Sequence, residues 1–400
     1  MPDVEVQAVD IEADASKAVD EMTNAELNER ECTSLPLTLK SRPLTLYAEV
    51  SAYCNMQCRM CGRTVYGVKP SDQGFMGRDV YERLMELCAP GSRMAMFGGG
   101  ETLMHKDFKY FLKLAAERGM LVSFNTNGRL LTRDIAEAMV EYGQDGLVIS
   151  CSAGTAETYE IIHRGGRWKE LWRNIEGLRS AKVARHGDDP FAKPHTYLEF
   201  VAQKDNVHEL PTLLRRAWEY GFVGLVVVDL VAHSDEMEAQ RVNTPEMQSV
   251  AEKYYRHAMK IRRGFGLSPA FTLHLPASRN SVTKELSPVM DEELPEAPEA
   301  PEGGQEQAED EQDYFCLEPW HSFYVRYDGT VGPCCITARR LGNLNEQSAE
   351  DIWNGEMFQK FRARMRSKEK PFECLACHAF PGPKRFDPEL LGDPENFPPL

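Results

Sequence analysis

The sequence predicts an α/β fold, namely a partial (β/α)6 TIM-like barrel followed by a small cysteine-rich C-terminal domain. From about residue 44 to residue 276, short apolar runs of β type alternate with amphipathic helical stretches. Alternation of this kind is typical of parallel strands joined by right-handed helical crossovers. Five cysteines then follow beyond residue 313, after a segment that is poor in large apolar side chains. That separation predicts a second, smaller unit.

Each expected strand is a short apolar run. The six runs span residues 44–50, 94–97, 121–124, 146–150, 196–201 and 223–228. Helical stretches such as residues 78–88 and 209–220 stand between some of them. Six units fit a partial barrel, whose functional residues are expected at the C-terminal ends of the strands, as in closed β/α barrels.

Charge and composition divide the chain further. An acidic N-terminal extension covers residues 1–43, and its first 31 residues hold ten acidic side chains against Lys17 and Arg30. We expect the barrel core over 44–283, an acidic proline-rich disordered linker over 284–313, the cysteine-rich domain over 314–380 and a proline-rich tail over 381–400. The net charge of -16 belongs mainly to the first 31 residues and the linker, which are expected to be solvated, so it says little about the active site.

The composition excludes several classes of function. No stretch approaches the roughly 18 consecutive apolar residues of a membrane span, and the acidic N-terminus is unlike a targeting peptide. Basic residues are scattered without a sustained run, so no nucleic-acid surface is expected. The eleven cysteines are odd in number and lie mainly in two regions, which favours reduced thiolates in the cytoplasm over disulfides.

The most informative segment follows the first expected strand. Cys54, Cys58 and Cys61 fall within eight residues there. Three thiolates in one loop can hold three irons of a four-iron cluster and leave the last iron open to a non-protein ligand. A structural zinc site is the alternative, but it needs a fourth ligand close by, and the nearest histidine is His105.

Glycines and polar residues end the next three strands. Residues 98–101 read Gly-Gly-Gly-Glu, where glycines let the backbone approach a ligand and one carboxylate can pair with an ammonium group. Residues 125–128 read Asn-Thr-Asn-Gly after the third strand. At the end of the fourth strand Ser150 and Ser152 share one face, so Cys151 points the other way and is expected to be a packed core thiol.

These motifs, in this order, resemble those of the radical S-adenosylmethionine (SAM) superfamily. In that family SAM chelates the open iron of a [4Fe-4S] cluster and is cleaved reductively to a 5′-deoxyadenosyl radical, with ferredoxin or flavodoxin as electron donor. His163 stands where the family commonly has arginine, and Arg164 is the candidate replacement. The resemblance implies that the residues contacting SAM are Gly99, Gly100, Glu101, Asn125, Asn127, Ser150, Ser152 and Arg164.

The C-terminal cysteines form a second set. Four thiolates close the coordination of one iron-sulfur cluster, and zinc held by the same four is the alternative. This stretch resembles the auxiliary-cluster domains called SPASM or twitch, which implies one auxiliary [4Fe-4S] cluster. Its expected ligands are Cys316, Cys334, Cys374 and Cys377. Cys335 is left over, and it is a candidate hydrogen donor to a substrate radical, as is Cys151.

The resemblance implies a radical SAM oxidoreductase or epimerase. The substrate we expect is a small polar metabolite such as a sugar, an aminocyclitol or a natural-product intermediate. Modification of a peptide or protein is the alternative, and a non-catalytic iron-sulfur electron carrier is the second. His233 and Asp229 lie near a strand end but are not assigned a catalytic role.

Overall fold

The structure is a computed structural model, and it describes residues 22–142, 145–264, 272–274, 316–335, 337, 339–367, 371 and 374. The expected linker 284–313 and tail 381–400 lie outside the described residues. Within the described part, no helix is long and apolar enough to cross a membrane.

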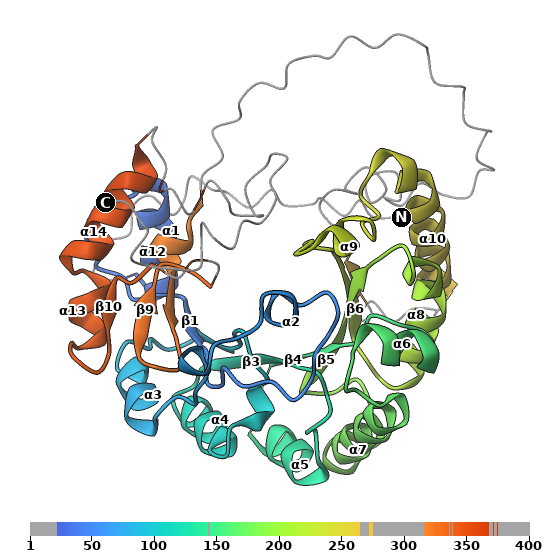
Figure 1. Ribbon diagram of the computed structural model, residues 1–400. Helices are drawn as coiled ribbons and strands as arrows, with labels where there is room; N and C mark the ends of the chain where they lie inside the picture. Colours follow the sequence, from blue (N-terminus) through green and yellow to red (C-terminus); the bar gives the residue numbers. More distant parts are fainter. Residues whose placement is uncertain are drawn as a thin grey trace, which may run out of the picture.

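One curved sheet of ten strands organises the chain (Figure 1). All six predicted strands are present, and seven strands run parallel in sequence order along the sheet. These are β1 Thr45–Ala48, β2 Arg93–Met96, β3 Leu121–Thr126, β4 Gly146–Ser150, β5 His195–Ala202, β6 Gly224–Asp229 and β7 Thr272–His274. The partial barrel predicted from the alternation is therefore confirmed.

Helices cover the outer side of the sheet (Figure 1). They are α3 Arg78–Met85, α4 Phe108–Glu117, α5 Arg133–Glu141, α6 Ala156–Ile162, α7 Trp168–His186, α8 Leu210–Glu219 and α10 Pro245–Gly264. In β5 every second side chain is buried, from Thr196 to Ala202, and the side chains between them are less so. The alternation packs one face of the strand under the helices and leaves the other on the concave side.

Shorter elements lie at the ends of the strands. They are α2 Gly62–Tyr66, the 3-10 turns η3 Pro70–Asp72, η4 Thr102–Met104 and η5 Val207–Glu209, and α9 Asp235–Glu238. Figure 1 shows α2 on the inner side of the curved sheet, opposite the covering helices. The segment between β1 and β2 therefore projects over the concave face.

The C-terminal residues extend the same sheet. Strand β8 Ser322–Val325 pairs in parallel with β1 on the side away from β2, and β9 Thr330–Gly332 and β10 Gly342–Asn343 follow antiparallel. Strands β8 and β9 form a hairpin ahead of Cys334, with Gly329 at φ 83° in its turn. The described C-terminal helices are α12 Glu318–His321, α13 Ala349–Trp353 and α14 Glu356–Arg366. The cysteine-rich unit thus shares the barrel sheet rather than standing apart.

The expectation that all of residues 1–31 are solvated is wrong for the part that the structure describes. Helix α1 Asn24–Ser34 begins with a Thr23–Glu26 capping box and packs against α12. The side chain of Asn28 is fully buried and donates 2.8 Å to the carbonyl of Trp320. Glu31 accepts hydrogen bonds from the backbone amides of Lys40 and Ser41. Part of the acidic segment is therefore built into the cysteine-rich unit.

A buried arginine fastens the same region. Arg362 is 0% exposed, and it donates to the carbonyls of Pro319 and Leu37 at 2.9 Å each. Its guanidinium carbon lies 4.3 Å from the ring centre of Trp353. Residues before β1 and residues after β8 are thereby held together by one side chain.

Candidate radical SAM site

The three cysteines of the first loop lie together over the concave face. Cys61 is the N-cap of α2, and its amide donates to the carbonyl of Cys58 at 3.1 Å. Burial, together with repulsion between its thiolate and those of Cys61 and Cys54, raises the pKa of Cys58 to about 12. Three thiolates so close to one another need positive charge between them, which the irons of a cluster supply. The donor set therefore fits an iron-sulfur cluster.

The described residues contain no group of three His, Cys, Asp or Glu side chains that converge on one metal ion. Thiolates of a four-iron cluster each bind a different iron, so such convergence is not expected of them.

The glycine turn after β2, residues 98–101, packs directly on the cysteine loop, residues 51–62. The amide of Glu101 donates to the carbonyl of Tyr53 at 2.7 Å. A Cβ atom on Gly100 would lie 2.5 Å from that same oxygen and would also overlap the carbonyl of Ser51. Only glycine allows this close approach of two backbones. The two motifs, nearly 50 residues apart in the chain, thus form one unit.

Glu101 lies inside this unit rather than on its surface. The residue is 2% exposed, and burial raises the pKa of its carboxyl. Its Oε1 accepts from the Thr126 hydroxyl at 2.6 Å and the Leu103 amide at 3.1 Å, and its Oε2 accepts from the Asn127 amide at 2.8 Å. A carboxylate has about four acceptor positions, so one remains for a ligand.

The turn after β3 is fixed to the same loop. The amide group of Asn127 donates 2.8 Å to the Asn55 side chain, between the first two cysteines, and Asn127 is 8% exposed. Asn125, two residues earlier, is exposed. Of the two predicted contacts, Asn125 is therefore open to a ligand, whereas Asn127 is engaged in holding the cysteine loop.

The segment after β4 buries Ser152. Ser152 is 0% exposed, and its hydroxyl accepts from the Val201 amide at 3.1 Å. The hydroxyl is thus already engaged by β5, and contact of Ser152 with SAM stays a prediction. Ser150 is partly exposed and Arg164 is exposed. Cys151 is a buried core thiol, as predicted, and burial raises its pKa to about 12.

The same segment is hydrogen-bonded along the cysteine loop. The amide of Gln57 donates to the carbonyl of Arg164 at 2.8 Å, and the amide of Arg59 to the carbonyl of Ile162 at 2.9 Å. Between them, the His163 ring lies 3.5 Å from the sulfur of Cys58 through Nδ1. From the sequence, His163 could be noted only as a departure from the family pattern, without this contact to Cys58.

Cys334 and Cys335 lie near Tyr47 of β1 and Tyr324 of β8. Burial raises the pKa of Tyr47 and of Tyr324, and the nearby thiols of Cys334 and Cys335 raise both further. Cys316, Cys334 and Cys374 are half-buried, and Cys335 is exposed. The predicted ligand Cys377 lies outside the described residues.

Two concave-face acids were missed by sequence reasoning. Glu49 is 5% exposed at the end of β1, where Oε1 accepts from the Gly99 amide at 2.7 Å and Oε2 lies 3.7 Å from Arg326 Nε. Glu199 faces the concave side of β5 in register with Ser150. Burial raises the pKa of both carboxyls. A single acid within the apolar run of β5 was the available signal for Glu199.

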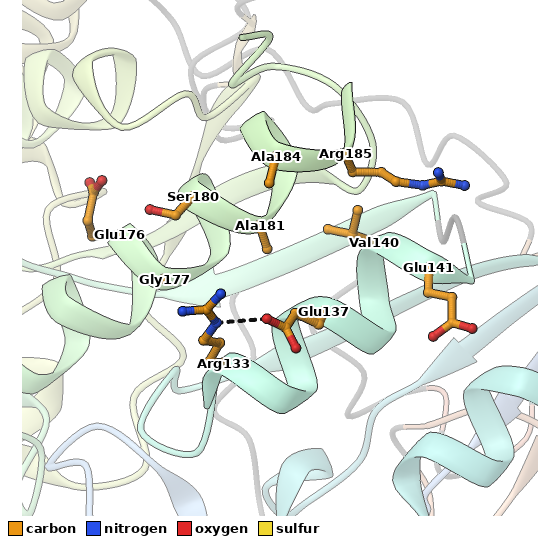
Figure 2. Close-up of a pocket in the computed structure, with 10 residues that line it drawn as sticks. All are labelled: Arg133, Glu137, Val140, Glu141, Glu176, Gly177, Ser180, Ala181, Ala184 and Arg185. Atoms are coloured by element: carbon orange, nitrogen blue, oxygen red, sulfur yellow. Dashed lines mark hydrogen bonds and ion pairs between the residues drawn. The ribbon is translucent and has the colours of Figure 1, made fainter. Parts of the chain in front are cut away.

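A groove of about 540 Å³ lies elsewhere, between α5 and α7 on the outside of the molecule (Figure 2). Its lining includes Val140, Ala181 and Ala184, and the Arg133–Glu137 pair, joined at 2.7 Å, lies on its edge. No residue of the cysteine loop or the glycine turn lines it. The groove is therefore separate from the site just described.

The fold and this site define a radical SAM protein. A model of the radical SAM superfamily matches residues 48–197, and a model of an iron-sulfur cluster-binding domain, SPASM, matches residues 316–378. The chain belongs to the radical SAM superfamily and carries a SPASM domain. Its cofactors are accordingly SAM, the [4Fe-4S] cluster that binds SAM, and auxiliary iron-sulfur binding in the C-terminal domain.

Named relatives cover most of the chain. It is 25% identical to the AdoMet-dependent heme synthase of Methanosarcina barkeri over 334 residues, 82% of this chain and 86% of the relative. It is 24% identical to the PqqA peptide cyclase of Granulibacter bethesdensis over 349 residues, 84% of this chain and 79% of the relative. Among solved structures, Streptococcus suis SuiB bound to SAM has a TM-score of 0.60 at 15% identity, covering 89% of this chain and 75% of SuiB.

Proposed function

We propose that Cys54, Cys58 and Cys61 hold three irons of the SAM-binding cluster and that SAM takes the fourth. The observation that carries this proposal is the docking of the glycine turn on the cysteine loop, with Gly100 packed against two loop carbonyls. The turn then presents Gly99, with Asn125 and Ser150 exposed or partly exposed on neighbouring strand ends. With both groups bound, one low-potential electron from a ferredoxin or flavodoxin type donor would cleave SAM to methionine and a 5′-deoxyadenosyl radical, which would become 5′-deoxyadenosine by taking a hydrogen atom from a substrate carbon.

The residues of the chain have separate tasks in this proposal. Glu101 joins the glycine turn to the cysteine loop through its backbone amide and to the turn after β3 through its carboxylate, and the remaining acceptor position would bind the SAM ammonium group. Arg164 is exposed and is the proposed partner of the SAM carboxylate. Ser152 is left out, because its side chain bridges strands β4 and β5 instead.

We propose that the SPASM domain holds one auxiliary cluster through Cys316, Cys334, Cys374 and Cys377. Four protein ligands leave such a cluster no open position for substrate, so its suitable role is electron transfer. Cys335 is exposed beside Cys334 and is the proposed hydrogen donor if the reaction is an epimerisation. Deuterium from solvent would then appear in the product.

We propose a peptide as the substrate class. PqqA peptide cyclases of several bacteria are among the relatives that span over four fifths of this chain, and SuiB, which shares the fold, has been solved with a precursor peptide. The small polar metabolite expected from the sequence gains no comparable support. AdoMet-dependent heme synthases among the relatives support a non-peptide substrate as the alternative.

The test measures 5′-deoxyadenosine formed by anaerobically reconstituted protein with SAM and dithionite, with Cys58→Ala as control. Cell extract is added in two size fractions, each with and without protease treatment. Stimulation by the large fraction that protease abolishes supports a peptide. Protease-resistant stimulation by the small fraction supports a metabolite instead. No 5′-deoxyadenosine under any condition, with full iron content, contradicts the enzyme and favours an electron carrier.

A further inference from the structure

His163 connects the end of β4 to the central cysteine of the loop. His163 is 1% exposed and is the C-cap residue of α6. Ring atom Nε2 lies 2.9 Å from the backbone nitrogen of Ser152, and Nδ1 lies 3.5 Å from the sulfur of Cys58. The imidazole therefore bridges a backbone amide and a cysteine that is proposed to bind iron.

The Ser152 contact fixes where the ring hydrogen lies. A backbone N–H can only donate, so Nε2 must be the acceptor and carries no hydrogen. A neutral imidazole has one N–H, which then belongs to Nδ1. That hydrogen points at Cys58, so the contact is an N–H···S hydrogen bond with the histidine as donor.

The surroundings prevent the ring from turning away. The backbone bonds of Gln57 and Arg59 to residues 164 and 162 hold the loop on both sides of Cys58. On its face, the His163 ring stacks on Tyr159 at 4.9 Å between centres and 28° between planes. The hydrogen bond is thus held by the fold and shielded from water.

We infer that His163 is a positioning residue that raises the reduction potential of the SAM-binding cluster through Cys58. This rests on the proposed function, in which Cys58 is a cluster ligand. Reduction adds negative charge that spreads onto the sulfurs, and a hydrogen-bond donor at a ligand sulfur stabilises the reduced state more than the oxidised one. SAM cleavage starts from the reduced state, so His163 would set how readily the electron donor can start the reaction.

The chain offers a closely matched control in His105. That ring is 4% exposed, accepts from the Asp107 amide at 2.9 Å through Nδ1 and lies 2.9 Å from the Met76 carbonyl through Nε2. It therefore bridges a backbone amide and an acceptor as His163 does, but its acceptor is not a sulfur. Replacing either ring by phenylalanine removes one buried bridge of the same kind.

The experiment is an EPR-monitored redox titration of full-length protein carrying its clusters, in which the SAM-binding cluster is recognised by the change that SAM causes in its signal. For His163→Phe we expect the ratio of reduced to oxidised cluster at a fixed potential to fall about tenfold, equal to about 59 mV for one electron. His105→Phe should leave it unchanged. An unchanged midpoint in His163→Phe, or equal shifts in both variants, overturns the inference.

A second measurement needs no variant at that position. Pulsed EPR of reduced wild-type protein labelled with 15N-histidine should detect a weak coupling to one ring nitrogen, and its absence overturns the inference. The proposed function fails separately, if Cys58→Ala keeps a SAM-responsive cluster.

Discussion

Replacing Glu101 by glutamine tests whether the hydrogen bonds that hold its carboxylate to Leu103 and to the turn after β3 control SAM binding. The carboxylate accepts two backbone amides and one hydroxyl, and all three donors come from other parts of the same site. Glutamine has almost the same shape but only one acceptor oxygen. Whichever way its amide points, an NH2 group faces a backbone N–H, and that buried N–H loses its acceptor.

The magnitude follows from that count. An unsatisfied buried donor costs about 1–3 kcal/mol, and bonds to a charged acceptor are stronger than those to a neutral one. We expect the free energy of unfolding to fall by about 2–4 kcal/mol. If about 1.4 kcal/mol of this shifts the turn away from its binding arrangement, SAM affinity falls about tenfold.

Glu31 provides the matched control. Its carboxylate, 8% exposed, also accepts two backbone amides and one hydroxyl, from Lys40 and Ser41, but it lies in α1 beside the SPASM domain. Urea unfolding should show similar losses for Glu31→Gln and Glu101→Gln. Equilibrium dialysis of labelled SAM against iron-loaded protein should show weaker binding only for Glu101→Gln. Wild-type affinity in that variant, or equal weakening in both, would refute the reasoning.

Three further outcomes are expected. Gly100→Ala should lower iron content and SAM binding, because the added Cβ would overlap two carbonyls of the cysteine loop. Gly177→Ala is the control: it has open space around it, so in thermal unfolding it should be as stable as wild type or more stable by about 1 kcal/mol. In urea unfolding, Arg362→Met should lower the free energy of unfolding by about 3–5 kcal/mol, because it removes the hydrogen-bond donors of two buried carbonyls. Arg366 is exposed, so Arg366→Met should lower it by less than about 0.5 kcal/mol. Burial lowers the pKa of Lys182 to about 8, whereas its value in the unfolded chain is near 10.5. Between these two pH values the unfolded chain holds more protons than the folded one, so folding becomes more favourable as the pH rises. Across that window the free energy of unfolding of the wild type should rise by up to about 3 kcal/mol relative to Lys182→Met, and below pH 8 it should not change relative to the variant.

Much of the barrel could be predicted because its signal is local. Each strand of the core is an apolar run that ends in glycine or a polar residue, and period-two alternation correctly placed Cys151 in the core. The cysteine spacing and the Gly-Gly-Glu turn could be recognised as motifs for the same reason, since the residues of each motif lie close together in the chain. Strand ends in parallel β/α units meet at one edge, so their juxtaposition followed from topology.

Pairings between distant segments could not be predicted in this way. Strand β8 joins β1 although more than 270 residues separate them, and nothing in either run specifies that neighbour. The acidic composition of helix α1 favours solvation on average. Asn28 and Glu31 are nevertheless buried, because each forms hydrogen bonds with residues of other segments. Composition describes the average behaviour of a segment, whereas burial depends on its individual partners.

Ser152 and His163 show how the same limit affects the site. Alternation placed Ser152 on the face of Ser150, and it gave no sign that the Ser152 hydroxyl accepts a hydrogen bond from the Val201 amide of β5. His163 could be marked only as a substitution for arginine, because the contact that gives it a role joins it to a cysteine over 100 residues earlier. An arginine carries charge toward a ligand, whereas a neutral histidine can accept from one backbone group while donating to a sulfur. The change from arginine to histidine at this position therefore replaces a charge that could face SAM with a hydrogen bond that faces the proposed cluster ligand.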